Sequence, residues 1–293
     1  MPNIAFFMNH PLSSLSIVAL LMATVLCWMP RLKELCQLTL LAFLVLGLLA
    51  GHITFVGAVI LGILYYYLFH LSRSYRENPI LSLIFFLAGA AAYLHFLPGF
   101  QNWLLINNVE PSPLSLPYRA YFNYDKYCIG VMLLATLPLS KSFQDVLAAV
   151  KHTFLPIVLC VGVLMAGAYA LGYITYDPKL PPIWPLWVVH NLFFVVVAEE
   201  VFFRGFIQRK LTTFCSKQQW SPMLALVLTS VLFGLYHYTG GALYVFLSSI
   251  AGLFYGYVYL KTERIEVSMA LHFLVNFLHF LFFTYPMAKT VLE

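Results

Sequence analysis

The sequence predicts an all-α polytopic membrane protein with about ten (8–10) transmembrane helices. Hydrophobic residues make up 62% of the 293 residues and charged residues 9%, whereas a soluble domain has about 45–50% and about 25%. The apolar residues are gathered in runs of roughly 18–22, which is the length that spans a bilayer. The net charge of +5 is spread over many short loops, so it indicates orientation in a membrane and no nucleic-acid partner.

Ten apolar runs are candidate spanning helices. The second and the fifth are short, which leaves eight or nine spans open as alternatives. The runs are 12–29, 36–50, 53–72, 80–97, 126–140, 154–175, 184–206, 222–239, 241–260 and 267–286.

The basic residues between these runs are unevenly distributed. Arg204 apart, eleven fall in one alternate set of loops and four in the other. The larger set is Arg31, Lys33, Arg73, Arg76, Lys141, Lys151, Arg209, Lys210, Lys217, Lys261 and Arg264, and the smaller is Arg119, Lys126, Lys179 and Lys289. The positive-inside rule then places both termini outside the cytoplasm.

Polar functional groups are sparse before residue 150 and dense after it. We therefore divide the chain by role into residues 1–150, N-terminal transmembrane helices of unassigned role, and residues 151–293, which carry the chemistry. The longest non-spanning segment, 98–125, is expected at the outer interface. Segment 141–152 either lies along the inner surface or links two spans.

Three charges interrupt the apolar run 184–206. Inserting a charged residue at mid-membrane costs a free energy of about 2.5–3.5 kcal/mol, so such residues usually form ion pairs or take part in catalysis. Glu200 and Arg204 are spaced i,i+4 with the acid first, the favourable order for a helical pair. Glu199 has no such partner within its helix, and an unpaired carboxylate in a low dielectric takes up a proton readily, as a general base must. Alternatively, Glu199 reaches the inner interface.

Two later helices add polar groups at the same spacing. Phe233 and His237 share one helix face, and His272 and Asn276 share another. An isolated histidine in an apolar helix is more often a packing residue. Here, however, three successive helices together offer a base, imidazoles and an amide donor, which hydrolysis of a peptide bond requires.

The three motifs resemble those of a known family. EEVFFR matches its EExxxR motif, FGLYH its FxxxH motif and HFLVN its HxxxN motif. The family is the CAAX-protease and bacteriocin-processing (abortive-infection type) family of intramembrane glutamate-dependent endopeptidases. The resemblance covers roughly residues 150–290.

The resemblance implies a role for each matched residue. Glu199 would activate water with His237 as its partner, and His272 and Asn276 would stabilise the oxyanion. Three further residues would support them, namely Glu200, Arg204 and Phe233. The implied substrate is a membrane-associated protein or peptide within the lipid bilayer.

Two alternatives stay open. Two histidines and glutamates are also zinc ligands, but Asn276 is a poor one, so we expect no cofactor and keep zinc as the alternative. A non-hydrolytic membrane protein, such as a transporter or an immunity-type binding protein, would use the same polar groups to hold a ligand. The predicted location is a prokaryotic inner membrane, which makes prenylated substrates unfavourable.

Overall fold

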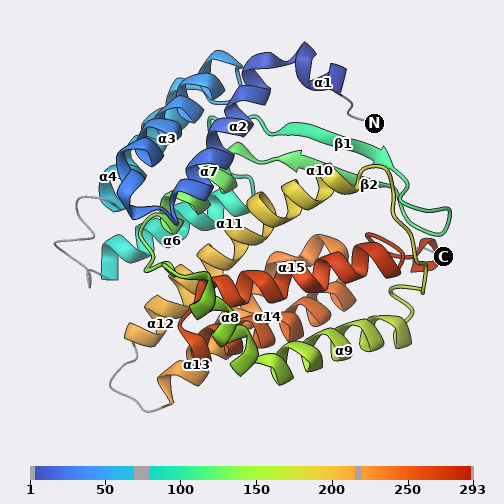
Figure 1. The fold of residues 1–293 in the computed structure, drawn as a ribbon. Helices are drawn as coiled ribbons and strands as arrows, with labels where there is room; N and C mark the ends of the chain where they lie inside the picture. The colour runs from blue at the N-terminus through green and yellow to red at the C-terminus, as the bar shows by residue number, and fades with distance from the viewer. Residues whose placement is uncertain (1–3, 69–78, 215–219, 292–293) are drawn as a thin grey trace. The chain divides into compact units, whose positions relative to one another are not determined.

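The computed structural model describes residues 4–68, 79–214 and 220–291 (Figure 1). The chain divides into two compact units. Unit 1 comprises Met1–Ile106, Ala120–Leu139 and Phe193–Phe202, and unit 2 comprises Asn107–Arg119, Ser140–Leu192 and Phe203–Glu293. The division of role at residue 150 stays a prediction.

Unit 1 is built mainly from helices of the N-terminal half. The helix α2 packs against α3, and Thr54 caps α4 by accepting a hydrogen bond from the backbone N–H of Gly57 at 3.4 Å. The helices are α1 (Ile4–Asn9), α2 (Pro11–Leu26), α3 (Lys33–Leu49), α4 (Phe55–Tyr66), α6 (Pro79–Tyr93), α7 (Tyr124–Leu134) and α11 (Val197–Glu200), and a 3₁₀ turn covers Pro30–Leu32.

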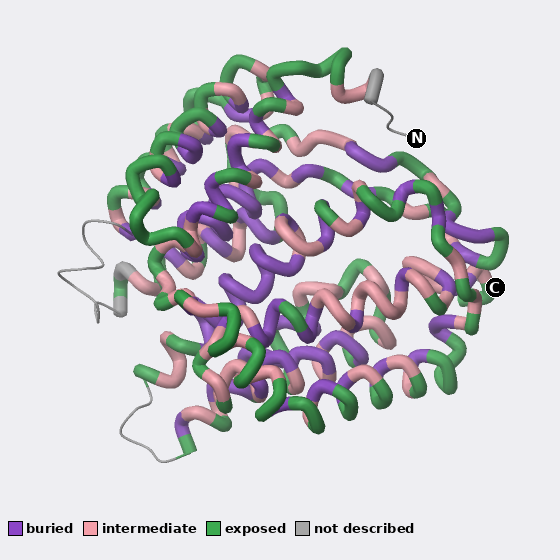
Figure 2. Tube along the Cα trace, viewed as in Figure 1, coloured by how far each residue is buried: buried purple, intermediate pink, exposed green. Residues whose placement is uncertain are grey.

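The helix α7 is the core of unit 1. Every residue from Tyr124 to Leu134 is buried (Figure 2). α2, α6 and α11 all pack against it. A helix that is covered on all sides has no face for water or lipid, so its polar residues need partners inside the protein.

Unit 2 contains the helices that follow residue 140. α14 packs against α9, α13 and α15, as the lower part of Figure 1 shows. The helices are α8 (Phe143–His152), α9 (Phe154–Ala170), α10 (Trp184–Val189), α12 (Arg209–Phe214), α13 (Ser221–Tyr236), α14 (Ala242–Thr262) and α15 (Ile265–Phe282), with 3₁₀ turns at Tyr238–Gly240 and Lys289–Val291.

The α13–α14 pair depends on glycines. Gly241 has φ +87° and lets the chain reverse after α13. The glycines of the GxxxG pattern, Gly252 and Gly256, bring α14 against α13: a Cβ on Gly252 would lie 3.0 Å from the Cα of Ser230. Small residues at this spacing let two helices pack closely.

A small sheet corrects the all-α prediction. The strands β1 (Trp103–Val109) and β2 (Tyr118–Phe122) pair within the long segment 98–125. Residues 103–109 include types that favour a β-strand, but the prolines and asparagines around them led us to expect a loop. The fold is mostly helical with one two-stranded sheet.

The helix that carries the charges is longer and less regular than expected. It runs without a break from Trp184 to Phe214, 31 residues, in place of 184–206. Two of its parts, His190–Val196 and Val201–Gln208, are π-helical and flank α11. Such widened turns are frequent at functional sites. The extra length also places Glu199 near the middle of the helix.

The described residues show fewer candidate spans than the expected ten. Among the described residues, four helices are long and apolar enough to cross a membrane, namely Pro30–Leu49, Trp184–Phe214, Ala242–Thr262 and Ile265–Phe282. α8 and α9, which meet at a 65° bend, give a fifth if the pair is one span. Other apolar runs form helices of 10–17 described residues, which is less than the about 20 residues that usually span a bilayer core of about 30 Å.

Large apolar side chains cover much of the surface. Leu38, Leu41 and Leu49 of α3 are 55–66% exposed. Exposed apolar surface of this extent marks contact with a partner or a membrane. Together with the long apolar helices, it indicates an integral membrane protein.

Candidate active site

Unit 2 contains a partly open cavity of about 80 Å³ between α9, α13, α14 and α15. Four of the residues that the sequence analysis selected line it, namely Phe233, His237, His272 and Asn276. His279, one turn beyond Asn276, lines the same cavity. Most other lining residues are apolar or aromatic, a composition that small-molecule and peptide sites share.

His237 follows the last residue of α13 and has a fixed tautomer. Its Nδ1 lies 2.7 Å from the carbonyl oxygen of Phe233. A carbonyl oxygen only accepts, so Nδ1–H is the donor and Nε2 of the neutral ring is the nitrogen that can take a proton. The Phe233 ring lies 4.7 Å from the imidazole, edge to face.

His272 is held between two aromatic rings. Its imidazole stacks on Tyr255 at 4.6 Å and 19° and meets the Phe233 ring edge to face at 5.7 Å. Only 4% of the residue is exposed. These contacts leave the ring little freedom to rotate, so its orientation toward the cavity is set before any ligand arrives.

Asn276 lies one turn after His272 and is oriented by another amide. Its Nδ2 donates to Oδ1 of Asn191 at 3.3 Å. Asn191 is 4% exposed, and the sequence analysis missed it. The signal was available, because His190 and Asn191 are adjacent polar residues within an apolar run, nine and eight positions before Glu199.

Arg204 is fully buried in unit 2. Its guanidinium carbon lies 4.4 Å from the centre of the Phe233 ring, and Nη2 donates to the carbonyl oxygen of Gly252 at 3.2 Å. One turn later, Nε2 of Gln208 donates to the carbonyl oxygen of Gly256 at 3.0 Å. The two glycines therefore let side chains of the motif helix reach the backbone of α14, and Arg204 supports the ring that contacts both histidines. Its pairing with Glu200 stays a prediction.

Glu199 and Glu200 belong to unit 1 and are 3% and 0% exposed. The sequence analysis gave Glu199 no partner, and this is incomplete. Nζ of Lys126, on α7, lies 2.7 Å from Oε1 of Glu199. Lys126 was assigned to an outer loop because it stands at the edge of an apolar run, but only 4% of its side chain is exposed. That Glu199 works together with His237 stays a prediction.

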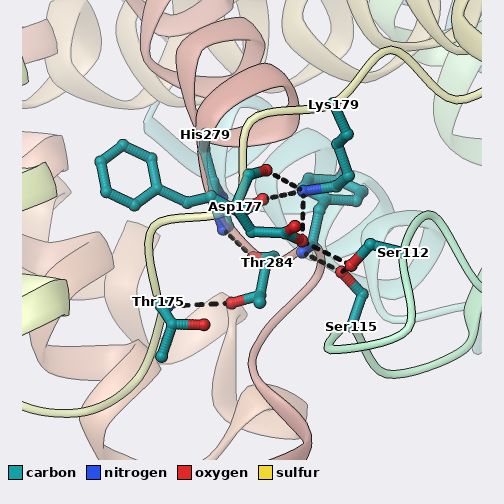
Figure 3. A network of polar contacts seen from close by, with 9 residues as sticks. Ser112, Ser115, Thr175, Asp177, Lys179, His279 and Thr284 are labelled. Atoms are coloured by element: carbon teal, nitrogen blue, oxygen red, sulfur yellow. Dashed lines mark hydrogen bonds and ion pairs between the residues drawn. The ribbon is translucent and has the colours of Figure 1, made fainter.

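A polar network fixes the segments beside the cavity (Figure 3). Nε2 of His279 donates to the carbonyl oxygen of Thr284 at 3.0 Å. The ammonium of Lys179 pairs with Asp177 at 3.2 Å and also donates to the carbonyl of Phe283. Desolvation lowers the pKa of Lys179, against the opposing effect of Asp177. Ser112 donates to Asp177 and thereby ties segment 107–119 to the same network.

The described residues offer no ready zinc site. Nowhere among them do three His, Cys, Asp or Glu side chains lie close enough to hold a metal ion. A catalytic zinc site uses three protein ligands. His237, His272 and His279 line one cavity, but the three do not lie close enough together to hold a metal ion, so the donor set does not fit as it stands.

The fold and the site define a helical membrane protein in which two motif histidines and an amide line one partly open cavity. Residues 180–278 match the family model described as type II CAAX prenyl endopeptidase Rce1-like. The match confirms the resemblance that was inferred from the three motifs. A match to this family suggests a protease, which acts on a protein substrate. No curated protein and no solved structure matches the chain.

Proposed function

We propose that the protein is an intramembrane endopeptidase that hydrolyses a peptide bond of a membrane-associated protein or peptide. The observation that carries this proposal is the cavity lined by His237, His272 and Asn276. These residues come from two of the three motifs, which lie far apart in the sequence. Glu199, from the third motif, is proposed as the base that takes a proton from water.

The proposed roles follow from the chemistry of each group. With Nδ1–H bonded to a carbonyl, His237 exchanges a proton at Nε2 and suits delivery to the leaving amine. His272 and Asn276 would donate to the oxyanion that forms when water attacks the carbonyl carbon. Arg204 and Phe233 are proposed to support the imidazoles, and Glu200 to pair with Arg204.

The decisive experiment compares membranes from cells that contain the wild-type protein with membranes that contain Glu199→Gln. The amide keeps the shape of the side chain but cannot accept the proton, so cleavage should be lost while the protein still inserts. New peptide termini, identified by mass spectrometry, should appear with the wild type and be absent with the variant. The matched control is Glu110→Gln, which changes an exposed glutamate paired with Lys289 at 3.1 Å.

Identical sets of termini in both membranes would overturn the proposal. A ligand-binding or transport protein would produce that result, because it would hold its ligand without breaking a bond.

A further inference from the structure

Lys126 is a buried cation inside the core of unit 1. It lies in the first turn of α7, the helix whose residues are all buried. Its Nζ lies 2.7 Å from Oε1 of Glu199, and each side chain is 4% exposed. A lysine is almost never buried in this way without a specific partner, because an isolated ammonium in a low dielectric is strongly disfavoured.

The surroundings of this pair hold both of its members in place. The rings of Tyr93 and Tyr127 lie 5.4 Å and 5.8 Å from Nζ, within reach of a cation–π interaction. The Tyr93 hydroxyl donates to the carbonyl oxygen of Ala198, the residue before Glu199. α6 and α7 therefore fix both the ammonium and the backbone that carries the carboxylate.

The other charged groups near the pair are few. Asp125 precedes Lys126, accepts a hydrogen bond from its backbone N–H at 2.8 Å and pairs with His95 at 3.3 Å. Glu200 follows Glu199 on α11, and Arg204 lies one turn further along the same continuous helix. The charge of Lys126 lies in direct contact with Glu199.

We propose that Lys126 is a positioning residue that keeps Glu199 ionised and fixes the direction of its carboxylate. This inference rests on the proposed function in one respect, the use of Glu199 as a base. It also gives the N-terminal half a role, since α7 would supply a group that the catalytic motif needs.

The physical argument compares two states of the carboxyl group. A glutamate buried without a cation is driven toward its neutral form, and a neutral carboxyl group cannot accept a proton from water. An ammonium in contact favours the ionised form and fixes the direction of the carboxylate through one of its oxygens. Lys126 acts through Glu199 and not on the substrate.

The test measures the protonation of Glu199 directly, without any substrate. The purified full-length protein is titrated while its infrared spectrum is recorded, and the protonated-carboxyl band of Glu199 is identified by its loss in Glu199→Gln. In Lys126→Met the pH at which this band reaches half its full intensity, the midpoint, should rise by about 1–3 pH units. This is the usual effect of losing an opposite charge in contact. Lys126→Arg keeps the charge and should leave the midpoint near the wild-type value.

Two further variants keep the test decisive. Lys126→Gln, which retains a hydrogen-bond donor without the charge, should also move the midpoint up and replaces the methionine variant if that one does not fold. Lys289→Met removes the exposed partner of Glu110 and should change nothing.

Each outcome decides one question. An unchanged midpoint in Lys126→Met and Lys126→Gln would overturn the inference. A shifted midpoint in a protein that cleaves no membrane peptide would leave the inference intact and refute the proposed function. Where the wild type cleaves, the acid limb of kcat/KM should follow the infrared midpoint in every variant, which a merely structural lysine would not produce.

Discussion

Asn276 shows how the candidate site is prepared before a ligand binds. Its amide donates to Asn191, which itself is buried in the widened part of the motif helix. An amide has two N–H groups, so this bond fixes the plane of the group and leaves the second N–H available to an oxyanion. Preorganisation of this kind accounts for much of the effect of an oxyanion site, because the donors need not reorient during the reaction.

The first prediction at the residue scale concerns this pair. Asn276→Ala should lower kcat by about 10²–10³, the usual loss for one oxyanion donor, with little change in KM. Asn191→Ala should lower kcat less, and Asn191→Asp, which keeps the accepting oxygen, should restore part of it. Steady-state kinetics on a peptide that the wild type cleaves would measure both effects. Asn9→Ala, at an exposed position, is the control, and an unchanged kcat in Asn276→Ala would remove the residue from the oxyanion role.

Single polar residues were visible in the sequence because each stands out against an apolar background. Glu199, His237, His272 and Asn276 were found in this way, and three of them line the cavity. Lys126 was not found, because a lysine at the edge of an apolar run looks like a loop residue that orients the helix. Its partner lies 73 positions away, and periodicity carries no information about pairs at such separation.

At the scale of elements, the contact between α7 and α11 depends on a glycine. A Cβ on Gly130 would lie 2.9 Å from both the Cα and the Cβ of Ala198. Gly130 is one turn from Lys126, and Ala198 adjoins Glu199, so the glycine contact and the ion pair lie on the same face of α7. The two helices can approach closely enough for the ion pair because no side chain separates them.

The second prediction therefore changes this glycine. Gly130→Ala should push α7 away from α11 and reduce the free energy of unfolding by about 1–3 kcal/mol. The melting temperature should fall accordingly, and cleavage should decrease. Gly162→Ala in α9 is the matched control, because nothing lies within 4 Å of its Cβ position and alanine is the better helix former by about 0.5–1 kcal/mol. Equal melting temperatures for the two variants would show that the α7–α11 contact is not tight.

Hydropathy located the helices better than it fixed their lengths. The expected runs 36–50, 184–206, 241–260 and 267–286 correspond to the four long apolar helices. The run 222–239 was expected to span, but its helix ends at Tyr236, where a 3₁₀ turn and Gly241 reverse the chain. A window of mean hydropathy includes such turns when the turn residues are themselves apolar or small.

At the scale of the whole molecule, the orientation inferred from the basic residues depends on the ten expected spans that define the two sets of loops, and it stays a prediction. Lys126 is buried and leaves the smaller set. Arg73, Arg76 and Lys217 lie outside the described residues. The number of spans also bears on the termini, because four would place them on the same side of the membrane and five on opposite sides.

The last prediction tests that orientation. In a variant whose native cysteines are replaced by serine, a cysteine introduced at the exposed position Thr213, near Arg209 and Lys210, should react with an impermeant thiol reagent only from the cytoplasm. A cysteine at Thr290, exposed near the other end of the chain, should react only from outside, as should a tag placed before Met1. The reverse pattern would overturn the orientation inferred from charge. A tag at Met1 on the side opposite to Thr290 would instead require an odd number of spans and favour the bent pair α8–α9 as one crossing.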